Sequence, residues 1–302
     1  MRSSLLLFTL LLTTAGALRS QNAISADPAP DPASPPTMRE FTIPSHGQPL
    51  VGVFYLAAGA ELHPTAILLH GFPGFEQNLD LAQTLRRGGW NVLALHYRGA
   101  WGTPGVFSFA HAIEDADAEL DFVLDPVHSA QFRIDNHRVV LIGHSMGGFM
   151  AASAAAQRAG VPGPQPAGVI MISAWDIAGR FSHAKDTDFA GVQKTFLADT
   201  EPNDFLPLAG CTPQSLAAEI FEHRTSYTFA ALAPRLTHAR VLLITADDGS
   251  DADSTALLKT LQSVGGNALV SKEHLATDHP FSGQRIALET SVLHWLAALP
   301  QQ

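Results

Sequence analysis

The sequence has little cysteine, few charged residues and a deficit of positive charge. Cys211 is the only cysteine among 302 residues, which excludes an intrachain disulfide and a thiolate metal cluster. Charged residues make up 15% of the chain, and 18 basic residues against 28 acidic ones give a formal charge of −10 at pH 7. Nucleic-acid phosphates require a basic surface, so we expect no nucleic acid as a partner. The same balance disfavours docking to anionic lipid.

A metal-ligand pattern is also missing. No pair of histidines has zinc-ligand spacing backed by a third ligand, so we expect no metal and no other cofactor.

The apolar run at the N-terminus, Leu5 to Leu12, is well short of the roughly 20 residues that a membrane span needs. It follows Arg2 and precedes Ala15-Gly16-Ala17, the layout of a secretory signal peptide with an A-x-A cleavage site. We therefore expect residues 1–17 to be removed and the protein to be secreted or periplasmic, with no stable membrane anchor after cleavage. The proline-rich "DPAPDPASPP" that follows predicts an extended linker over residues 18–37.

The rest of the chain, residues 38–302, alternates between strand-like and helix-like runs, and 46% of the sequence is hydrophobic. Strands are expected over residues 50–57, 65–70, 91–97, 138–143, 167–173, 240–246 and 267–272, and helices near 77–88, 109–125, 145–159, 252–264 and 283–298. The later strands are continuously apolar, as in parallel strands covered on both faces. The pattern predicts an α/β fold with a mainly parallel sheet between helices.

Residues 174–239 do not fit this alternation. They hold only short helical fragments, interrupted by Pro202, Pro207, Pro213 and Pro234. Long structureless loops are uncommon in compact domains, so we expect a helical cap inserted over the carboxyl edge of the sheet.

Ser145 lies in Gly143-His144-Ser145-Met146-Gly147, between a buried strand and a helix pattern. The G-x-S-x-G motif in this context predicts a nucleophile elbow, a turn so tight that small residues must flank the serine. The turn would expose the hydroxyl above the sheet, and the following helix N-terminus would face a developing anion. The alternative is a serine that merely caps a helix after a glycine turn.

A nucleophilic serine needs a base, and the base needs a carboxylate to orient it. On a nucleophile elbow the acid and then the histidine follow the serine in the chain. His279, in the loop before the last predicted helix, is the expected base. His274 is the rival, but it follows a strand almost directly and fits a surface or packing role better.

The acid is expected in "VLLITADDGSDAD", residues 241–253, where a strand ends in an acidic loop. Asp248 is preferred, followed by Asp247 and then Asp251. Loop length at such a site varies by a residue, so all three stay candidates. Asp176, just after another strand, is a less orthodox candidate. Some of these aspartates are expected to be merely solvated.

Backbone N–H groups usually stabilise the oxyanion that forms after nucleophilic attack. The glycine-bearing turn in "LLHGFPGFE", residues 68–76, predicts the N–H of Phe72 as one donor. Met146, the residue after the serine, is predicted to supply the other. The nearby histidines His70, His96 and His144 fit structural roles better than catalytic ones.

From about Phe41 to Leu299 the chain resembles the α/β-hydrolase superfamily. "LLHGFPG", "GHSMGG" and "DHPFS" resemble the oxyanion loop, the elbow and the histidine loop of its serine-hydrolase branch, and "HYRGAWGTPGVFSF" resembles a segment of carboxylesterase-like and peptidase-like members. The resemblance implies an eight-stranded sheet, a cap and hydrolysis of an ester, thioester or amide through an acyl-enzyme. It carries over Ser145, His279 and the backbone groups of Phe72 and Met146. The acidic loop departs from the family's commoner pattern of glycine, two residues and aspartate, which leaves the acid open.

The preferred function is hydrolysis of a carboxylic ester with a small or medium acyl group. The alternatives are a serine peptidase of the prolyl-oligopeptidase-like or aminopeptidase-like kind, acting on short peptides, and a non-catalytic binding module with the same fold. Six aromatic residues of the cap are expected either to line an apolar acyl pocket or to pack within the cap: Trp175, Phe181, Phe189, Phe196, Phe205 and Phe221. The sequence leaves the oligomeric state open.

Overall fold

A computed structural model describes residues 23–237, 239–265 and 269–300 of the chain. The predicted signal peptide and the first five residues of the predicted linker lie outside these ranges. Residues 23–25 are helical, and Ala23 is buried, with its carbonyl accepting a hydrogen bond from Arg87 Nε at 2.6 Å. Residues 27–36 contain neither helix nor strand. The first strand begins at Thr37, one residue before the predicted start of the domain.

The described residues form an eight-stranded sheet in the order β1-β2-β4-β3-β5-β6-β7-β8. Its strands are β1 (Thr37–Ser45), β2 (Gln48–Leu56), β3 (His63–Leu69), β4 (Asn91–Leu95), β5 (Ile134–His144), β6 (Gly168–Ile172), β7 (Val241–Thr245) and β8 (Val270–His274). The β1–β2 and β2–β4 pairs are antiparallel, and all other pairs are parallel. The predicted α/β fold class is therefore confirmed.

Burial explains why the central strands have continuous apolar runs. Every residue of β3, β6 and β7 is buried, since helices cover both faces of the sheet there. The edge strand β1 alternates between exposed and more buried positions and carries charged residues, so the sequence prediction missed it.

The structure differs from the predictions in other places as well. The short helix α4 (Pro126–Phe132) was not expected, and β5 begins four residues before the predicted start at 138. Strand β8 runs through His274, two residues beyond its predicted end. His274 is therefore the last residue of an edge strand.

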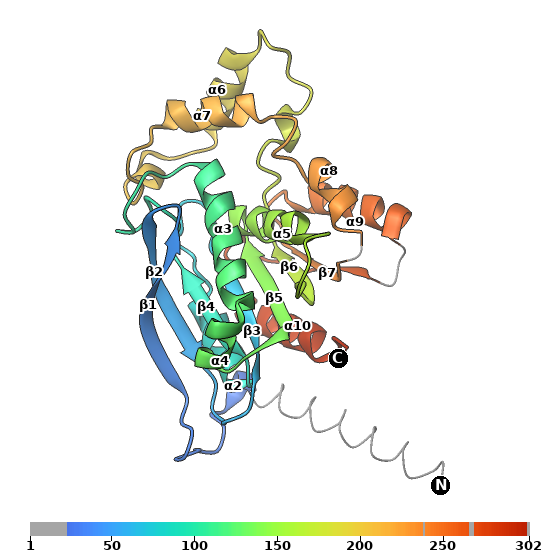
Figure 1. The fold of residues 1–302 in the computed structure, drawn as a ribbon. Helices are drawn as coiled ribbons and strands as arrows, with labels where there is room; N and C mark the ends of the chain where they lie inside the picture. Colours follow the sequence, from blue (N-terminus) through green and yellow to red (C-terminus); the bar gives the residue numbers. More distant parts are fainter. Residues whose placement is uncertain (1–22, 238, 266–268, 301–302) are drawn as a thin grey trace.

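Helices cover both faces of the sheet (Figure 1). On one face, α2 (Leu79–Arg87) and α10 (Arg285–Ala297) pack with β-strand side chains into one hydrophobic cluster. On the other, α3 (Phe109–Leu124), α5 (Met146–Arg158) and α9 (Asp251–Gly265) contribute to a larger cluster. None of the helices in the described part of the chain has the length and apolar character needed to cross a membrane.

The segment between β6 and β7 forms short helices. They are η1 (Gly179–Phe181), α6 (Phe189–Ala198), η2 (Pro202–Phe205), α7 (Pro213–Glu222), α8 (Phe229–Leu232) and η3 (Ala233–Arg235). Figure 1 shows α6 and α7 beyond one end of the sheet. In contrast, α8 packs against α5 and α9 and so joins the helical layer. We use the word cap for residues 174–228.

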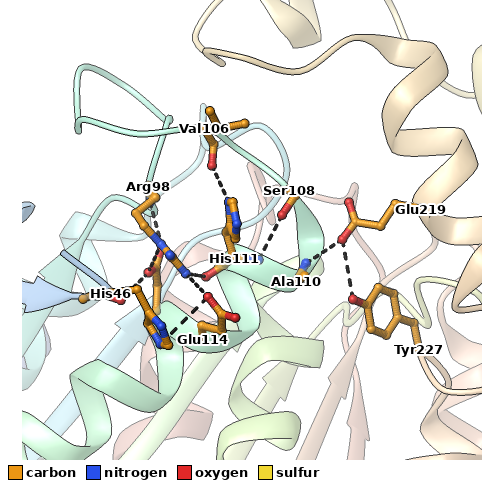
Figure 2. A network of polar contacts seen from close by, with 11 residues as sticks. His46, Arg98, Val106, Ser108, Ala110, His111, Glu114, Glu219 and Tyr227 are labelled. Carbon is orange, nitrogen blue, oxygen red and sulfur yellow. Dashed lines mark hydrogen bonds and ion pairs between the residues drawn. The ribbon is translucent and has the colours of Figure 1, made fainter. Parts of the chain in front are cut away.

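The cap is tied to the body of the domain by a helix terminus. Glu219 of α7 accepts hydrogen bonds from the first two N–H groups of α3, Phe109 at 3.1 Å and Ala110 at 2.6 Å. Figure 2 shows the bond from Ala110. A carboxylate is favourable at this position because helix N-termini carry partial positive charge. Backbone bonds of Ala209 with Gly99 and Phe107, at 2.7 and 2.9 Å, add a second attachment.

Candidate active site

Ser145 stands on a strained turn between β5 and α5. Its backbone has φ 55° and ψ −121°, and α5 begins at the next residue, Met146. A non-glycine residue at positive φ costs energy, and such conformations cluster at functional sites. The turn is held by Ser145 N–H, which donates to Ile172 O at 2.9 Å, and by Ser145 O, which accepts from Trp175 N–H at 3.0 Å.

The two glycines of the motif are required by close backbone approach. A methyl group at Gly143 would lie 1.9 Å from Gly147 O, and one at Gly147 would lie 2.0 Å from Leu69 O. Neither position has room for a side chain. This is the crowding that the motif predicts.

The loop after β3 passes directly beside the serine. A methyl group at Gly71 would lie 2.9 Å from Ser145 Cβ, so the backbone of residues 71–72 adjoins the serine side chain. Met146 is the first residue of α5, on the other side of the same serine. Both predicted oxyanion donors, Phe72 and Met146, are thus in segments next to Ser145.

Asp248 and His279 are in direct contact. His279 Nδ1 lies 2.6 Å from Asp248 Oδ2, and the Asp248 side chain is only 8% exposed. The other carboxylate oxygen, Oδ1, accepts hydrogen bonds from Ser250 N–H at 2.9 Å and Ser250 Oγ at 2.7 Å. Burial raises the pKa of Asp248, but the hydrogen bonds from His279 and Ser250 outweigh burial and hold that pKa well below its usual range. Asp248 is therefore an ionised acceptor that keeps the proton of His279 on Nδ1.

His144 connects the serine to the histidine loop. Its Nε2 lies 2.9 Å from His279 O, and the two imidazole rings are 4.6 Å apart. Burial and the nearby His279 lower the pKa of His144 to about 4, so it is a neutral ring at pH 7. The residue before the serine thus fixes the position of the predicted base.

The rival residues form a separate cluster. His274 Nε2 lies 3.1 Å from Asp247 Oδ1, and His274 Nδ1 lies 3.0 Å from Thr245 Oγ1. Asp251 accepts from Lys272 Nζ at 2.5 Å and from Thr245 Oγ1 at 2.8 Å. Asp247 and Asp251 therefore contact His274 and its neighbours, whereas Asp248 contacts His279.

Asp176, the fourth candidate acid, is engaged with the start of α8. Its Oδ1 accepts a hydrogen bond from Phe229 N–H at 2.9 Å, at the start of α8. Burial raises the pKa of Asp176 to about 6. Among the described residues no histidine bonds to its carboxylate.

His70 and His96 support the loop that carries Phe72. His70 is buried, with Nδ1 at 2.7 Å from Gly71 O and Nε2 at 3.3 Å from His96 Nδ1. Burial lowers the pKa of His70 to about 3. Trp101 Nε1–H donates to Pro73 O at 2.7 Å and fixes the loop further. These contacts agree with the predicted structural role of His70 and His96.

A cavity of about 240 Å³ opens beside Ser145. Its lining residues are Phe72, Ser145, Trp175, Arg180, Phe181, Phe196, Asp199, Thr200 and Asp204. The six cap aromatics divide between the two expected roles: Trp175, Phe181 and Phe196 line the cavity, whereas Phe189 and Phe221 pack on each other at 5.4 Å. Phe205 packs on Phe72 at 5.8 Å.

Several residues that hold or line this site were not predicted from the sequence. Ser250 was not recognised, although an aspartate followed two residues later by serine is a common turn that bonds back to the carboxylate. The Arg180–Asp199 ion pair in the cavity, with 2.6 Å between Nη1 and Oδ2, has no sequence signal because its partners are distant in the chain. Within the described ranges, no group of three or more histidine, cysteine, aspartate or glutamate residues is arranged to hold a metal.

Comparison with solved structures finds the same fold in several esterases. EstE1, a thermostable carboxylesterase from a metagenomic library, superposes with a TM-score of 0.63 at 18% identity, covering 97% of this chain and 98% of that one. A hyperthermophilic esterase from the archaeon Pyrobaculum calidifontis gives 0.61 at 17% identity, with 95% and 88% covered. Carboxyl esterase 2 of the fungus Tuber melanosporum gives 0.62 at 16% identity, with 96% and 98% covered.

Comparison of the sequence with curated proteins finds no match. The alpha/beta hydrolase family, in contrast, is matched over residues 66–289, which include the elbow, the acidic loop and His279. This range is well over half of the chain, and the sheet order and the turn at Ser145 agree with it. The chain belongs to the alpha/beta hydrolase family.

Proposed function

We propose that this protein is a serine hydrolase that cleaves carboxylic esters with small or medium acyl groups. Ser145 is the nucleophile, His279 the base and Asp248 the acid that orients it. The observation that carries the proposal is the 2.6 Å contact between His279 and Asp248, on a loop that His144 joins to the serine turn. Several structural neighbours are esterases, which supports the choice of an ester as substrate.

The mechanism follows from the proton positions. Because ionised Asp248 holds the proton of His279 on Nδ1, Nε2 is free to accept the proton of Ser145. Ser145 Oγ then attacks the ester carbonyl, and the N–H groups of Phe72 and Met146 stabilise the oxyanion. His279 gives its proton to the leaving alcohol, which leaves an acyl-enzyme. The same residues activate a water molecule that releases the acid and frees Ser145.

A fluorophosphonate tests this proposal directly, because it modifies only an activated serine. We expect one adduct on the peptide that contains Ser145, identified by mass spectrometry. The Ser145→Ala variant is the matched control and should remain unlabelled at unchanged thermal stability. A folded wild-type protein without an adduct at Ser145 would contradict the proposal and favour the binding-module alternative.

A substrate panel separates esterase from peptidase. We expect turnover of p-nitrophenyl acetate and butyrate, and little turnover of aminoacyl p-nitroanilides, with both activities absent in Ser145→Ala. Faster hydrolysis of the anilides would replace the ester assignment with the peptidase alternative.

The proposed site of action is outside the cytoplasm, in the periplasm or the medium. This part of the proposal rests on the sequence of residues 1–17. N-terminal sequencing of the exported protein should give a start near Leu18. An intact Met1 on cell-associated protein would contradict export.

A further inference from the structure

The cavity beside Ser145 has two different sides. Ser145 and Phe72 come from loops at the edge of the sheet, whereas Trp175, Arg180 and Asp199 come from the cap. Arg180 Nη1 lies 2.6 Å from Asp199 Oδ2, and both side chains are about half exposed, at 50% and 49%. Arg180 belongs to η1 and Asp199 follows α6, so the ion pair bridges two separate segments of the cap.

The ion pair is held in place by its surroundings. The Arg180 guanidinium lies 5.1 Å from the centre of the Phe181 ring, a cation–π contact with a residue that also lines the cavity. Asp204 is the third charged group of the cavity, and its Oδ2 already accepts from Glu201 N–H at 2.8 Å. The cavity beside Ser145 is therefore lined by aromatic side chains and by charged groups of the cap.

The size of the cavity makes these groups important for an acyl chain. Its volume of about 240 Å³ is below the roughly 300–1,000 Å³ typical of pockets for drug-sized ligands. An acyl chain attached to Ser145 can extend along Phe72, Trp175 and Phe196, and the charged groups of the cap line the same small cavity. A chain long enough to reach Arg180 and Asp199 must separate the ion pair or strip water from its charges, and both are unfavourable.

We propose that the Arg180–Asp199 ion pair sets the upper limit of acyl chain length, so that these two residues determine specificity. This inference rests on the proposed esterase function. Short acyl groups fit beside the aromatic side chains, and longer ones are excluded by the paired charges. The substrate class is narrowed to esters whose acyl group is short.

The test is an acyl-length profile measured with p-nitrophenyl acetate, butyrate, hexanoate and octanoate. Arg180→Ala removes the guanidinium. In this variant kcat/KM for octanoate, divided by kcat/KM for butyrate, should rise about tenfold or more. This is the effect of one or two methylene groups in a pocket. Asp199→Asn keeps the shape of the side chain and removes its charge, so the octanoate-to-butyrate ratio should rise less in this variant. The change should lie mainly in KM for the long esters.

Asp186→Asn is the matched control. Asp186 pairs with Arg224, also in the cap, but neither residue lines the cavity. Its length profile should match that of the wild type. If Arg180→Ala changes all four esters in parallel, or if Asp186→Asn shifts the profile as much as Asp199→Asn, the pair only stabilises the cap and the inference is wrong.

Salt gives a second measurement without a mutation at Arg180. A half-exposed ion pair is weakened at 1 M salt, where the Debye length falls to about 3 Å. The hexanoate-to-butyrate ratio should therefore rise with salt in the wild type and stay constant in Asp199→Asn. Equal salt effects in both proteins would overturn the inference. Ester turnover with an unchanged profile refutes this inference alone, whereas absence of Ser145-dependent ester turnover refutes the proposed function as well.

Discussion

Two histidine–aspartate pairs lie near the end of β8, and they differ in what surrounds them. His279 and Asp248 are 2.6 Å apart, the aspartate is 8% exposed, and His144 joins the histidine to the serine turn. His274 and Asp247 are 3.1 Å apart, and the aspartate is 63% exposed. The residue types are the same, and both aspartates come from one loop. Position relative to Ser145 and the burial of the acid distinguish the two pairs.

The difference has an electrostatic consequence. A buried carboxylate with several hydrogen bonds holds one histidine tautomer, which a base needs, whereas an exposed pair is screened by water and contributes little. The backbone also keeps the pairs separate, because Asp247 N–H donates to Thr277 O at 2.9 Å between the two histidines in the chain. The following predictions either compare the His279–Asp248 pair with the His274–Asp247 pair or test His144, which supports only the first of them.

The largest effect is expected from the two histidines. His279→Ala should reduce kcat for p-nitrophenyl butyrate by roughly 10⁴- to 10⁶-fold, as much as Ser145→Ala, because the groups of such a triad act as a unit. His274→Ala should change kcat less than about threefold, since its contacts do not reach the serine turn. Steady-state kinetics of the three variants give kcat for each. A greater loss in His274→Ala than in His279→Ala would reverse the assignment of the base.

Substitutions of Asp248 and Asp247 should differ in their effect on kcat nearly as much as those of the two histidines. Asp248→Asn should reduce kcat by roughly 10⁴-fold, because an amide in place of the carboxylate favours the wrong tautomer of His279. Asp247→Asn is the matched control from the neighbouring position and should leave kcat close to that of the wild type. Similar losses in both variants, at equal thermal stability, would contradict the selection of Asp248.

The buried His144, which supports only the first pair, predicts a pH dependence of stability. Its pKa in the folded protein is about 4, below the ordinary value of about 6.5. Between these values the unfolded chain binds a proton that the folded protein does not. The stability that the folded protein gains by keeping His144 neutral is therefore fully present above pH 6.5 and is lost as the pH falls towards 4.

Urea unfolding at several pH values measures this effect. From pH 7 to pH 4, His144 should account for a loss of about 1 to 3 kcal/mol in the free energy of unfolding. His144→Gln, which keeps a neutral hydrogen-bonding side chain, should show a shallower decline over the same range. Parallel curves for the two proteins would mean that His144 is not held neutral by the fold.

The smallest effect is expected for the stability provided by the second pair. Because Asp247 is mostly exposed, Asp247→Asn should lower the free energy of unfolding by no more than about 1 kcal/mol. Any loss should shrink in 1 M salt. A loss of several kcal/mol would show that the His274 cluster stabilises the sheet edge more than an exposed pair can.

The sequence by itself determined the central sheet and the serine turn, because these depend on local patterns. Strands buried on both faces must be apolar throughout, and the close approach at Gly143 and Gly147 leaves no room for a side chain. The edge strand β1 was missed for the opposite reason, since an exposed strand can carry charged residues. The extent of β8 was also misjudged, so the sequence did not show that His274 ends an edge strand.

Only the tertiary structure decided which aspartate contacts which histidine. Asp247, Asp248 and Asp251 are nearly equivalent in the sequence. Neighbouring side chains point in opposite directions where the chain is extended, so a shift of one residue changes which aspartate faces a given partner. The fold directs Asp248 towards His279 and the other two towards the His274 cluster. The cavity has the same origin. Phe72, Trp175, Phe196 and the Arg180–Asp199 pair come from four separate segments, and only packing of the cap on the sheet edge brings them together around Ser145.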